Sequence, residues 1–109
     1  MNRGITVIGF TLSMFNNVIV PYIVNQQPSQ IAMRNQCVTW LNNGTYIRWI
    51  PCNNSARGVK SWEIFCNINL EQGFCERIVL PMLSGDSVGI RWFNNLFEPV
   101  DPPRWYKGE

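Results

Sequence analysis

The sequence has no histidine and few charged side chains. The absence of histidine from all 109 residues removes the commonest general base, the commonest zinc ligand and every catalytic triad that depends on an imidazole. Only 15% of the residues are charged, and nine basic and seven acidic side chains leave a net charge of +2. That charge is too small to indicate nucleic acid or an anionic membrane surface as the partner.

Hydrophobic residues, in contrast to charged ones, are abundant. They make up 46% of the chain, and aromatic residues make up 13%. A chain this apolar can offset the entropy of ordering by burial, so whole-chain disorder is excluded. No internal repeat or low-complexity linker divides the sequence. We therefore expect a single β-rich domain over residues 1–109, with an uncharged N-terminal segment at 1–33 and an extended tail at 98–109.

The uncharged segment after Arg3 allows three interpretations. Two strands near 5–13 and 18–25 are favoured because β-branched residues crowd this stretch. A membrane-spanning or signal-anchor helix over 4–24 has sufficient length, but Asn16, Asn17 and Pro21 interrupt it. A cleaved signal peptide would need a small-residue cleavage site, and none follows, so we expect cytoplasmic synthesis without such a peptide.

The first residues resemble the start of a type IV prepilin. Arg3-Gly4 precedes the apolar stretch Ile5-Thr6-Val7-Ile8, as a basic residue and a glycine do at a prepilin processing site. Gly9 stands where such proteins carry a glutamate. The resemblance therefore covers only residues 3–8 and assigns no functional residue.

Short apolar runs separated by turn residues follow along the rest of the chain. Runs at 36–41 and 45–50 flank Asn42-Asn43-Gly44, a strong hairpin signal. Runs at 60–68 and 74–80 flank a second turn, and 87–93 forms another candidate strand. Prolines in the tail forbid helix and central strand there. The pattern predicts an all-β fold, an antiparallel sandwich or barrel built from short hairpins, with an extended Pro-rich C-terminal tail.

The four cysteines, Cys37, Cys52, Cys66 and Cys75, lack the spacing of a zinc site. No metal site and no cofactor are therefore expected. Cys66 and Cys75 lie equidistant from one predicted turn, and Cys37 and Cys52 from the other, which favours disulfides over buried free thiols. A tighter turn at 43–44 would instead place Cys37 opposite Ile50, and all three pairings stay open.

Two glycosylation sequons lie on predicted loops. They begin at Asn43 and Asn53, and such sites suit a secreted glycoprotein. With 13 asparagines in the chain, such triplets also arise easily by chance. The two asparagines are kept as candidate modification sites.

Three tryptophans directly follow an arginine, at Arg48-Trp49, Arg91-Trp92 and Arg104-Trp105. Alternation along a strand predicts Trp inside and Arg outside. On the surface, Trp92 with Arg91 and Arg104 would suit stacking on bases or sugar rings. In the same way, Trp105 and Tyr106 in the tail would suit anchoring on a neighbouring subunit.

No catalytic or nucleotide-binding motif is present, so the sequence indicates no enzyme. The favoured interpretation is a structural subunit of a viral particle or extracellular filament, located in a virion or outside the cell. It would form a homo-oligomer or larger assembly with protein partners through Ile5, Val7, Phe10, Trp105 and Tyr106. The alternatives are a secreted, disulfide-stabilised module that binds glycan or protein, and a small subunit anchored by one membrane span.

Overall fold

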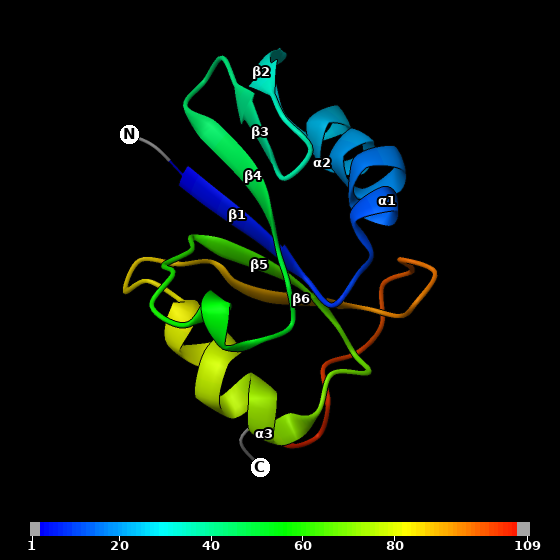
Figure 1. The fold of residues 1–109 in the computed structure, drawn as a ribbon, viewed down its shortest axis with the longest axis vertical. Helices are drawn as coiled ribbons and strands as arrows, with labels where there is room; N and C mark the ends of the chain where they lie inside the picture. The colour runs from blue at the N-terminus through cyan, green and yellow to red at the C-terminus, as the bar shows by residue number, and fades with distance from the viewer. Residues whose placement is uncertain (1–2, 107–109) are drawn as a thin grey trace.

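The computed structural model describes residues 3–106, which form a six-stranded mixed sheet in the order β2-β3-β4-β1-β5-β6 (Figure 1). The strands are β1 (Arg3–Ile8), β2 (Ile31–Arg34), β3 (Val38–Leu41), β4 (Thr45–Ile50), β5 (Glu63–Asn67) and β6 (Gly89–Phe93). Strand β1 pairs in parallel with β4 and β5, and β5 pairs in parallel with β6. Strand β3 pairs antiparallel with both β2 and β4. The expected all-β antiparallel sandwich or barrel is therefore wrong, because helical crossovers connect the parallel strands.

The first crossover follows β1 and consists of α1 (Leu12–Met14), the π-helical turn η1 (Phe15–Ile19) and α2 (Val20–Asn25). Its buried side chains recur at helical spacing: Phe15, Ile19, Val20 and Ile23. This apolar stripe packs on the sheet and overrides the strand preference of the β-branched residues. The predicted strand at 18–25 is therefore wrong.

Neither the prepilin-like helix nor the membrane span exists in the segment 4–24. Residues 3–8, which resemble a prepilin start, form strand β1 instead of a helix. The remainder of the segment is divided between a loop and the first crossover. Among residues 3–106, no helix is both long enough and apolar enough to cross a bilayer.

The second crossover leads from β5 to β6 through α3 (Gln72–Phe74), the π-helical turn η3 (Cys75–Val79) and the short 3-10 helix η4 (Leu80–Met82). Another short 3-10 helix, η2 (Asn54–Ala56), lies in the connection from β4 to β5. The predicted strand at 74–80 is thus helical. In both crossovers a π-helical turn ends directly before an X-Pro pair, Val20-Pro21 or Leu80-Pro81. Because proline lacks an N–H, the wider turn fits a position where an α-helical bond is missing.

The two crossovers cover opposite faces of the sheet and create two cores. On one face, Ile5 and Val7 of β1 pack with Phe15 and Ile19 of the first crossover. On the other face, Ile8 packs in a cluster with residues of the second crossover, such as Ile78 and Val79. Strand β1 is therefore buried on both faces, which explains its continuous apolar sequence.

One predicted hairpin is confirmed. Strands β3 and β4 are antiparallel around Asn42-Asn43-Gly44, with Trp40 opposite Tyr46.

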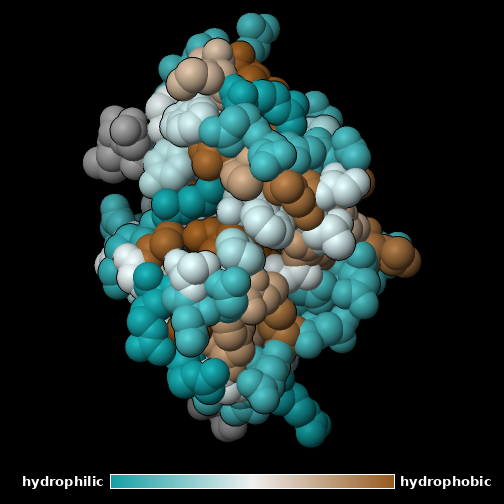
Figure 2. Space-filling view, viewed as in Figure 1, coloured by the Kyte–Doolittle hydropathy of each residue, from teal (hydrophilic) through white to brown (hydrophobic). Residues whose placement is uncertain are grey.

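On the molecular surface, hydrophilic residues cover most of the face shown in Figure 2, and hydrophobic residues are exposed in separate patches. The tail runs past the edge strand β6, where Phe93 forms a bridge with Pro99.

Candidate functional site

The sheet changes direction between β1 and β5. The connection that leaves β1 crosses towards β4, whereas the connection that leaves β5 crosses to β6 on the other side and the opposite face. In open α/β sheets, ligands bind outside the carboxyl ends of the strands at such a switch point. The carboxyl ends of β1 and β5 are therefore the place where this type of fold would hold a ligand.

The chain itself fills this position. Asn67 is buried at the end of β5, and its amide nitrogen donates to the Gly9 carbonyl at 2.9 Å and to Asn95 Oδ1 at 2.8 Å. Gly9 has a φ of +96°, and a Cβ at this position would lie 2.6 Å from the Asn67 Cβ. The two loops are thus in direct contact, and a bound phosphate would have to displace Asn67.

The switch point also lacks the groups that bind phosphate. A P-loop needs a glycine-rich turn followed by a lysine, but residues 9–14 read GFTLSM without a cation. A free N–H at the helix start is not available to a phosphate there, because the Met14 backbone N–H already donates to the Thr11 side chain, at 3.0 Å to Oγ1. Phe15, in the next position, is fully buried. The fold therefore has a strand–loop–helix arrangement here without P-loop chemistry.

Three of the four cysteines gather close to the switch point, and all four are free thiols. Cys66 and Cys75 are buried in the same core, where a hydrogen bond with Cys75, and burial, raise the pKa of the Cys66 thiol. Cys52 is exposed, whereas the Cys37 carbonyl accepts a backbone bond from Trp49 on the adjacent strand. The expected disulfide framework is thus wrong, because 74–80 is a helix and Cys37 lies opposite Trp49, not Cys52.

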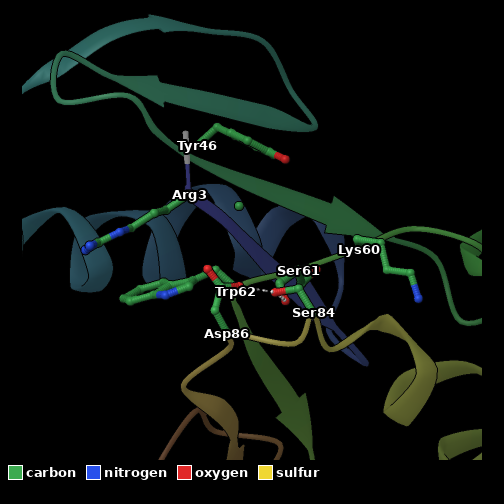
Figure 3. A pocket seen from close by; sticks show the side chains of 8 residues that line it. Arg3, Tyr46, Lys60, Ser61, Trp62, Ser84 and Asp86 are labelled. Atoms are coloured by element: carbon green, nitrogen blue, oxygen red, sulfur yellow. Dashed lines mark hydrogen bonds between the residues drawn. The ribbon is translucent and has the colours of Figure 1, made fainter. Parts of the chain in front are cut away.

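A cavity of about 330 Å³ opens at the other end of the sheet, where β1 and β5 begin. We call it the Arg3–Trp62 cavity, and its lining is shown in Figure 3: Arg3, Gly4, Tyr46, Lys60, Ser61, Trp62, Ser84 and Asp86. Its volume falls at the small end of the range for ligand pockets, roughly 300–1,000 Å³. Two cations and two aromatic rings thus surround one space.

The cations lie on different sides of this cavity. The Arg3 guanidinium lies over the Trp62 ring, 4.7 Å from its centroid, and the two side chains extend together in Figure 3. Lys60 extends away from that pair, and its ammonium donates to the Pro81 carbonyl at 2.8 Å. Since an ammonium has three donors, two remain for a ligand or water. Asp86, the one acid in the lining, accepts a hydrogen bond from Ser84 Oγ at 3.1 Å.

The walls of the cavity are fixed by backbone and side-chain bonds. The Trp62 backbone N–H donates to the Gly4 carbonyl at 2.8 Å, which continues the pairing of β1 and β5. The Ser61 hydroxyl, buried beneath the cavity, hydrogen-bonds the Thr6 hydroxyl. Arg48 donates to the same Thr6 oxygen at 3.1 Å and to the Lys60 carbonyl. The loop that carries Lys60 and Trp62 is therefore tied to β1 and β4.

A second cavity, of about 410 Å³, also touches the stacked Arg3 and Trp62. Its other walls come from the end of the first crossover and from the β3–β4 turn: Gln27, Pro28, Asn43 and Thr45. The stacked pair thus lies between two cavities and lines both of them.

The residues expected at a subunit interface lie elsewhere. Ile5 and Val7 are fully buried and Phe10 is 8% exposed, because the first crossover covers them. Trp105 and Tyr106 pack on Trp92 of the same chain, with ring centroids 6.0 and 5.3 Å away. The two tail rings therefore contact β6 of their own chain and not a neighbouring subunit.

The residues expected to stack on ligands are also separated. Trp92 is 4% exposed and has no face open to a base or sugar ring. Arg91 lies 4.0 Å from Glu63 and stacks on the Phe65 ring at 4.9 Å. Arg104 is exposed in the tail. The structure does not bring these three together as a ligand site.

The sequon asparagines are both exposed and lie in turns. Asn43 Oδ1 accepts the Thr45 N–H at 3.0 Å, and Asn53 Oδ1 accepts the Ser55 N–H at 2.9 Å. Their glycosylation stays a prediction.

The residues of the Arg3–Trp62 cavity were not identified as a site from the sequence. Lys60 and Trp62 flank a buried serine, but their side chains extend in different directions, so their spacing was no signal for a common site. Arg3 and Tyr46 had no signal either, because only the parallel pairing of β1 with β4 brings them together.

The sheet with a crossover on each face defines a mixed α/β domain. Comparison with solved structures shows one protein in which a similar fold occurs. The chain is similar to the large terminase from a thermophilic bacteriophage, with a TM-score of 0.61 and 13% identity over 86% of this chain. Another structure of that terminase, in complex with ADP, gives a TM-score of 0.60 at 13% identity. No protein-family model matches the chain, and no curated protein matches its sequence.

The match is one of fold, and it is partial. The aligned part of this chain spans 26% of the terminase chain, about a quarter of its length. The expected structural subunit of a particle or filament is nevertheless contradicted, because it relied on an uncharged N-terminal segment and an aromatic tail that were to contact neighbouring chains. Both segments pack within this chain instead. A mixed α/β fold, similar to part of the large terminase, replaces the expected β-sandwich. The secreted disulfide module is wrong because the thiols are free, and the membrane-anchored subunit is wrong because 4–24 is divided between a strand and a crossover.

Proposed function

We propose that the chain is a terminase-like domain that binds a nucleotide unit at the Arg3–Trp62 cavity without hydrolysing it. The observation that carries the proposal is the combination of Arg3, Lys60, Tyr46 and Trp62 around one cavity of about 330 Å³. Guanidinium and ammonium groups bind phosphate, and aromatic rings stack on bases. The matched terminase in complex with ADP makes a nucleotide the natural ligand class to test.

Local charge supports this proposal where the net charge did not. Among residues 3–106, the one ion pair joins Arg91 and Glu63, so neither Arg3 nor Lys60 is neutralised by a carboxylate. The net charge of +2 is a sum over the whole chain, so it does not show that unpaired cations lie together at one cavity. An anionic ligand would therefore meet two uncompensated cations at the cavity.

We expect no hydrolysis because the switch point, where this type of fold would hold and cleave a nucleotide, lacks the groups for phosphoryl transfer. Phosphoryl transfer needs a cation at the transferred group and an oriented nucleophile. The sequence offers neither a P-loop lysine at 9–14 nor a cation in the loop 67–71. The domain would thus hold a nucleotide at the amino ends of the strands and leave it intact.

Titration calorimetry with a nucleoside monophosphate tests the proposal directly. Arg3→Ala and Trp62→Ala are each expected to weaken binding about tenfold, the effect of losing one charge-assisted bond or one stacked ring. Asp86→Asn should strengthen it, because a negative charge leaves the lining. Arg104→Ala is the matched control, since Arg104 is exposed and does not line the cavity. Equal binding by all four variants, or hydrolysis of ATP by the unaltered chain, would overturn the proposal.

Association with other proteins belongs to the same proposal, because the proteins of similar fold come from a bacteriophage. The expected contacts through Ile5, Val7 and Phe10 are excluded by burial. The edge strand β2 is exposed along its whole length, with Met33 61% exposed. Such an edge is where a partner strand would add to the sheet. Light scattering of the chain over a concentration series tests for self-association through it.

A further inference from the structure

Part of one sheet face has no helix over it. Val38 and Trp40 of β3 lie opposite Arg48 and Tyr46 of β4, and this pairing places all four side chains on one face. The second crossover packs on the same face, but its cluster there involves Ile8 and other residues beyond these four. The four side chains are consequently half-buried, on a face open to solvent.

These residues line a cavity of about 360 Å³ that adjoins the Arg3–Trp62 cavity. We call it the Trp40 cavity, and its walls are Val38, Trp40, Gly44, Tyr46 and Arg48. Tyr46 lines both cavities, so the two spaces meet at its ring. The Trp40 cavity thus offers two aromatic rings on this face, Trp40 and Tyr46, whereas Trp62 packs against the cluster of the first crossover.

The cations follow the same line. Arg48 lies over the Tyr46 ring, 5.3 Å from its centroid, and its bonds to Thr6 and to the Lys60 carbonyl hold it there. Arg3 and Lys60 lie beside the next cavity. Among residues 3–106, none of these cations is paired with a carboxylate. A surface with alternating rings and uncompensated cations is complementary to a chain of bases and phosphates.

We propose that the ligand of this surface is single-stranded nucleic acid, which extends from the Arg3–Trp62 cavity across Tyr46 into the Trp40 cavity. This proposal rests on the proposed function, because it places one nucleotide of the strand in the Arg3–Trp62 cavity. Bases stack on Trp40 and Tyr46, and phosphates lie near Arg48 and Arg3. A duplex does not fit this mode of binding, because its bases are stacked on each other and cannot stack on the protein.

Fluorescence anisotropy with the full chain separates this proposal from the proposed function. The probes are a labelled thymidine monophosphate, a single-stranded oligothymidylate of about ten nucleotides and the duplex of the same length. We expect the oligonucleotide to bind at least about tenfold more tightly than the monophosphate, since stacking on a second ring contributes about that factor. The duplex should bind more weakly than the single strand.

Variants at Trp40 identify the surface. Trp40→Ala should weaken oligonucleotide binding about tenfold and leave monophosphate binding unchanged, because Trp40 lines the Trp40 cavity and not the Arg3–Trp62 cavity. Trp40→Phe keeps an aromatic ring and should retain most of the affinity. The exposed Met33→Ala on the neighbouring strand is a control for general effects on the hairpin, and circular dichroism checks that each variant is folded.

The outcomes are distinguishable. If neither probe binds, the proposed function fails and this proposal fails with it. If the monophosphate and the oligonucleotide bind equally and Trp40→Ala has no effect, only the extended surface is overturned. Equal affinity for the duplex, or for an acidic peptide of the same charge, would also overturn it, since either result would mean attraction by charge alone.

Discussion

At the scale of single residues, Gly4 determines where the Tyr46 ring lies. A Cβ on Gly4 would lie 2.7 Å from Tyr46 Oη and 2.8 Å from its Cζ, so the phenol ring rests on the bare glycine. The residue is buried in a central strand, where glycine is otherwise unfavourable. The glycine is thus explained by the position of a neighbouring ring that both cavities share.

Gly4→Ala should therefore move Tyr46 and weaken nucleotide binding. We expect a loss of about tenfold, comparable to removal of one stacking ring. Tyr46→Ala is the matched variant, and calorimetry should give both the same loss. Normal binding by Gly4→Ala with a displaced tyrosine signal in NMR would contradict the role assigned to the ring.

Glu63 makes the stability of the chain depend on pH. Burial raises the pKa of its carboxyl group above the ordinary value, and Arg91 offsets this only in part. A carboxyl whose pKa is higher in the folded state favours folding while it is protonated, and this contribution is lost as pH rises through the folded pKa. The ionised Glu63 thus costs stability at neutral pH.

Glu63→Gln should for that reason raise the midpoint of urea unfolding at pH 7 relative to the unaltered chain. The difference should disappear below about pH 4, where the glutamate is protonated in both states. Loss of the 4.0 Å contact with the partly exposed Arg91 works against this gain, but surface pairs contribute little. Glu71→Gln, at an exposed position, is the control. A difference that grows on acidification would have the wrong sign.

At the scale of elements, Asn67 joins three loops. Its side chain bonds the Gly9 carbonyl after β1, Asn95 after β6 and, at 2.8 Å, the Asn69 N–H after β5. Asn67→Ala leaves these groups without a partner in a site that is largely closed to water. The free energy of unfolding should fall by about 2 kcal/mol. Chemical denaturation measures this loss, with the exposed Asn42→Ala as control, and an unchanged midpoint would contradict the bridging role.

Local turn chemistry predicted some elements correctly. The β3–β4 hairpin follows from Asn-Gly, and strands near 60–68 and 87–93 correspond to β5 and β6. The helical crossovers were missed for a physical reason: β-branched residues prefer strands, and packing of one apolar stripe on the sheet outweighs that preference. The spacing of Phe15, Ile19 and Ile23 was the available signal for a helix.

The candidate site was less predictable than the elements. Its residues come from the start of β1, from β4 and from the loops before β5 and β6, so parallel pairing must be known before they can be grouped. The Arg-Trp pairs were adjacent in sequence and therefore easy to notice. Adjacency in a strand separates two side chains onto opposite faces, as Arg48 and Trp49 illustrate.

At the scale of the whole molecule, the site predicts a dependence of binding on salt. Contact of Arg3, Arg48 and Lys60 with phosphates would release counterions from a single strand, with a slope of about −0.7 per contact in log affinity against log salt. Three contacts correspond to a loss of about tenfold to twentyfold between 50 and 200 mM salt. Arg48→Ala should reduce the slope by about one contact, whereas Arg104→Ala should leave it unchanged. A flat salt profile would mean that phosphates are not bound.

The central position of β1 has a consequence for how the chain folds. The residues that it contacts lie far along the chain: Thr6 of β1 and Arg48 of β4 are 42 positions apart, and Gly9, directly after β1, and Asn67 of β5 are 58 apart. Closing such long loops must precede any gain from the parallel ladders, so the folding rate should be low for a chain of this size. During synthesis, β1 leaves the ribosome before β4 and β5, and both of its edges stay unpaired until those strands follow. The hydrophobic sequence that makes β1 a good centre for the sheet therefore makes it the segment most exposed to aggregation before folding is complete.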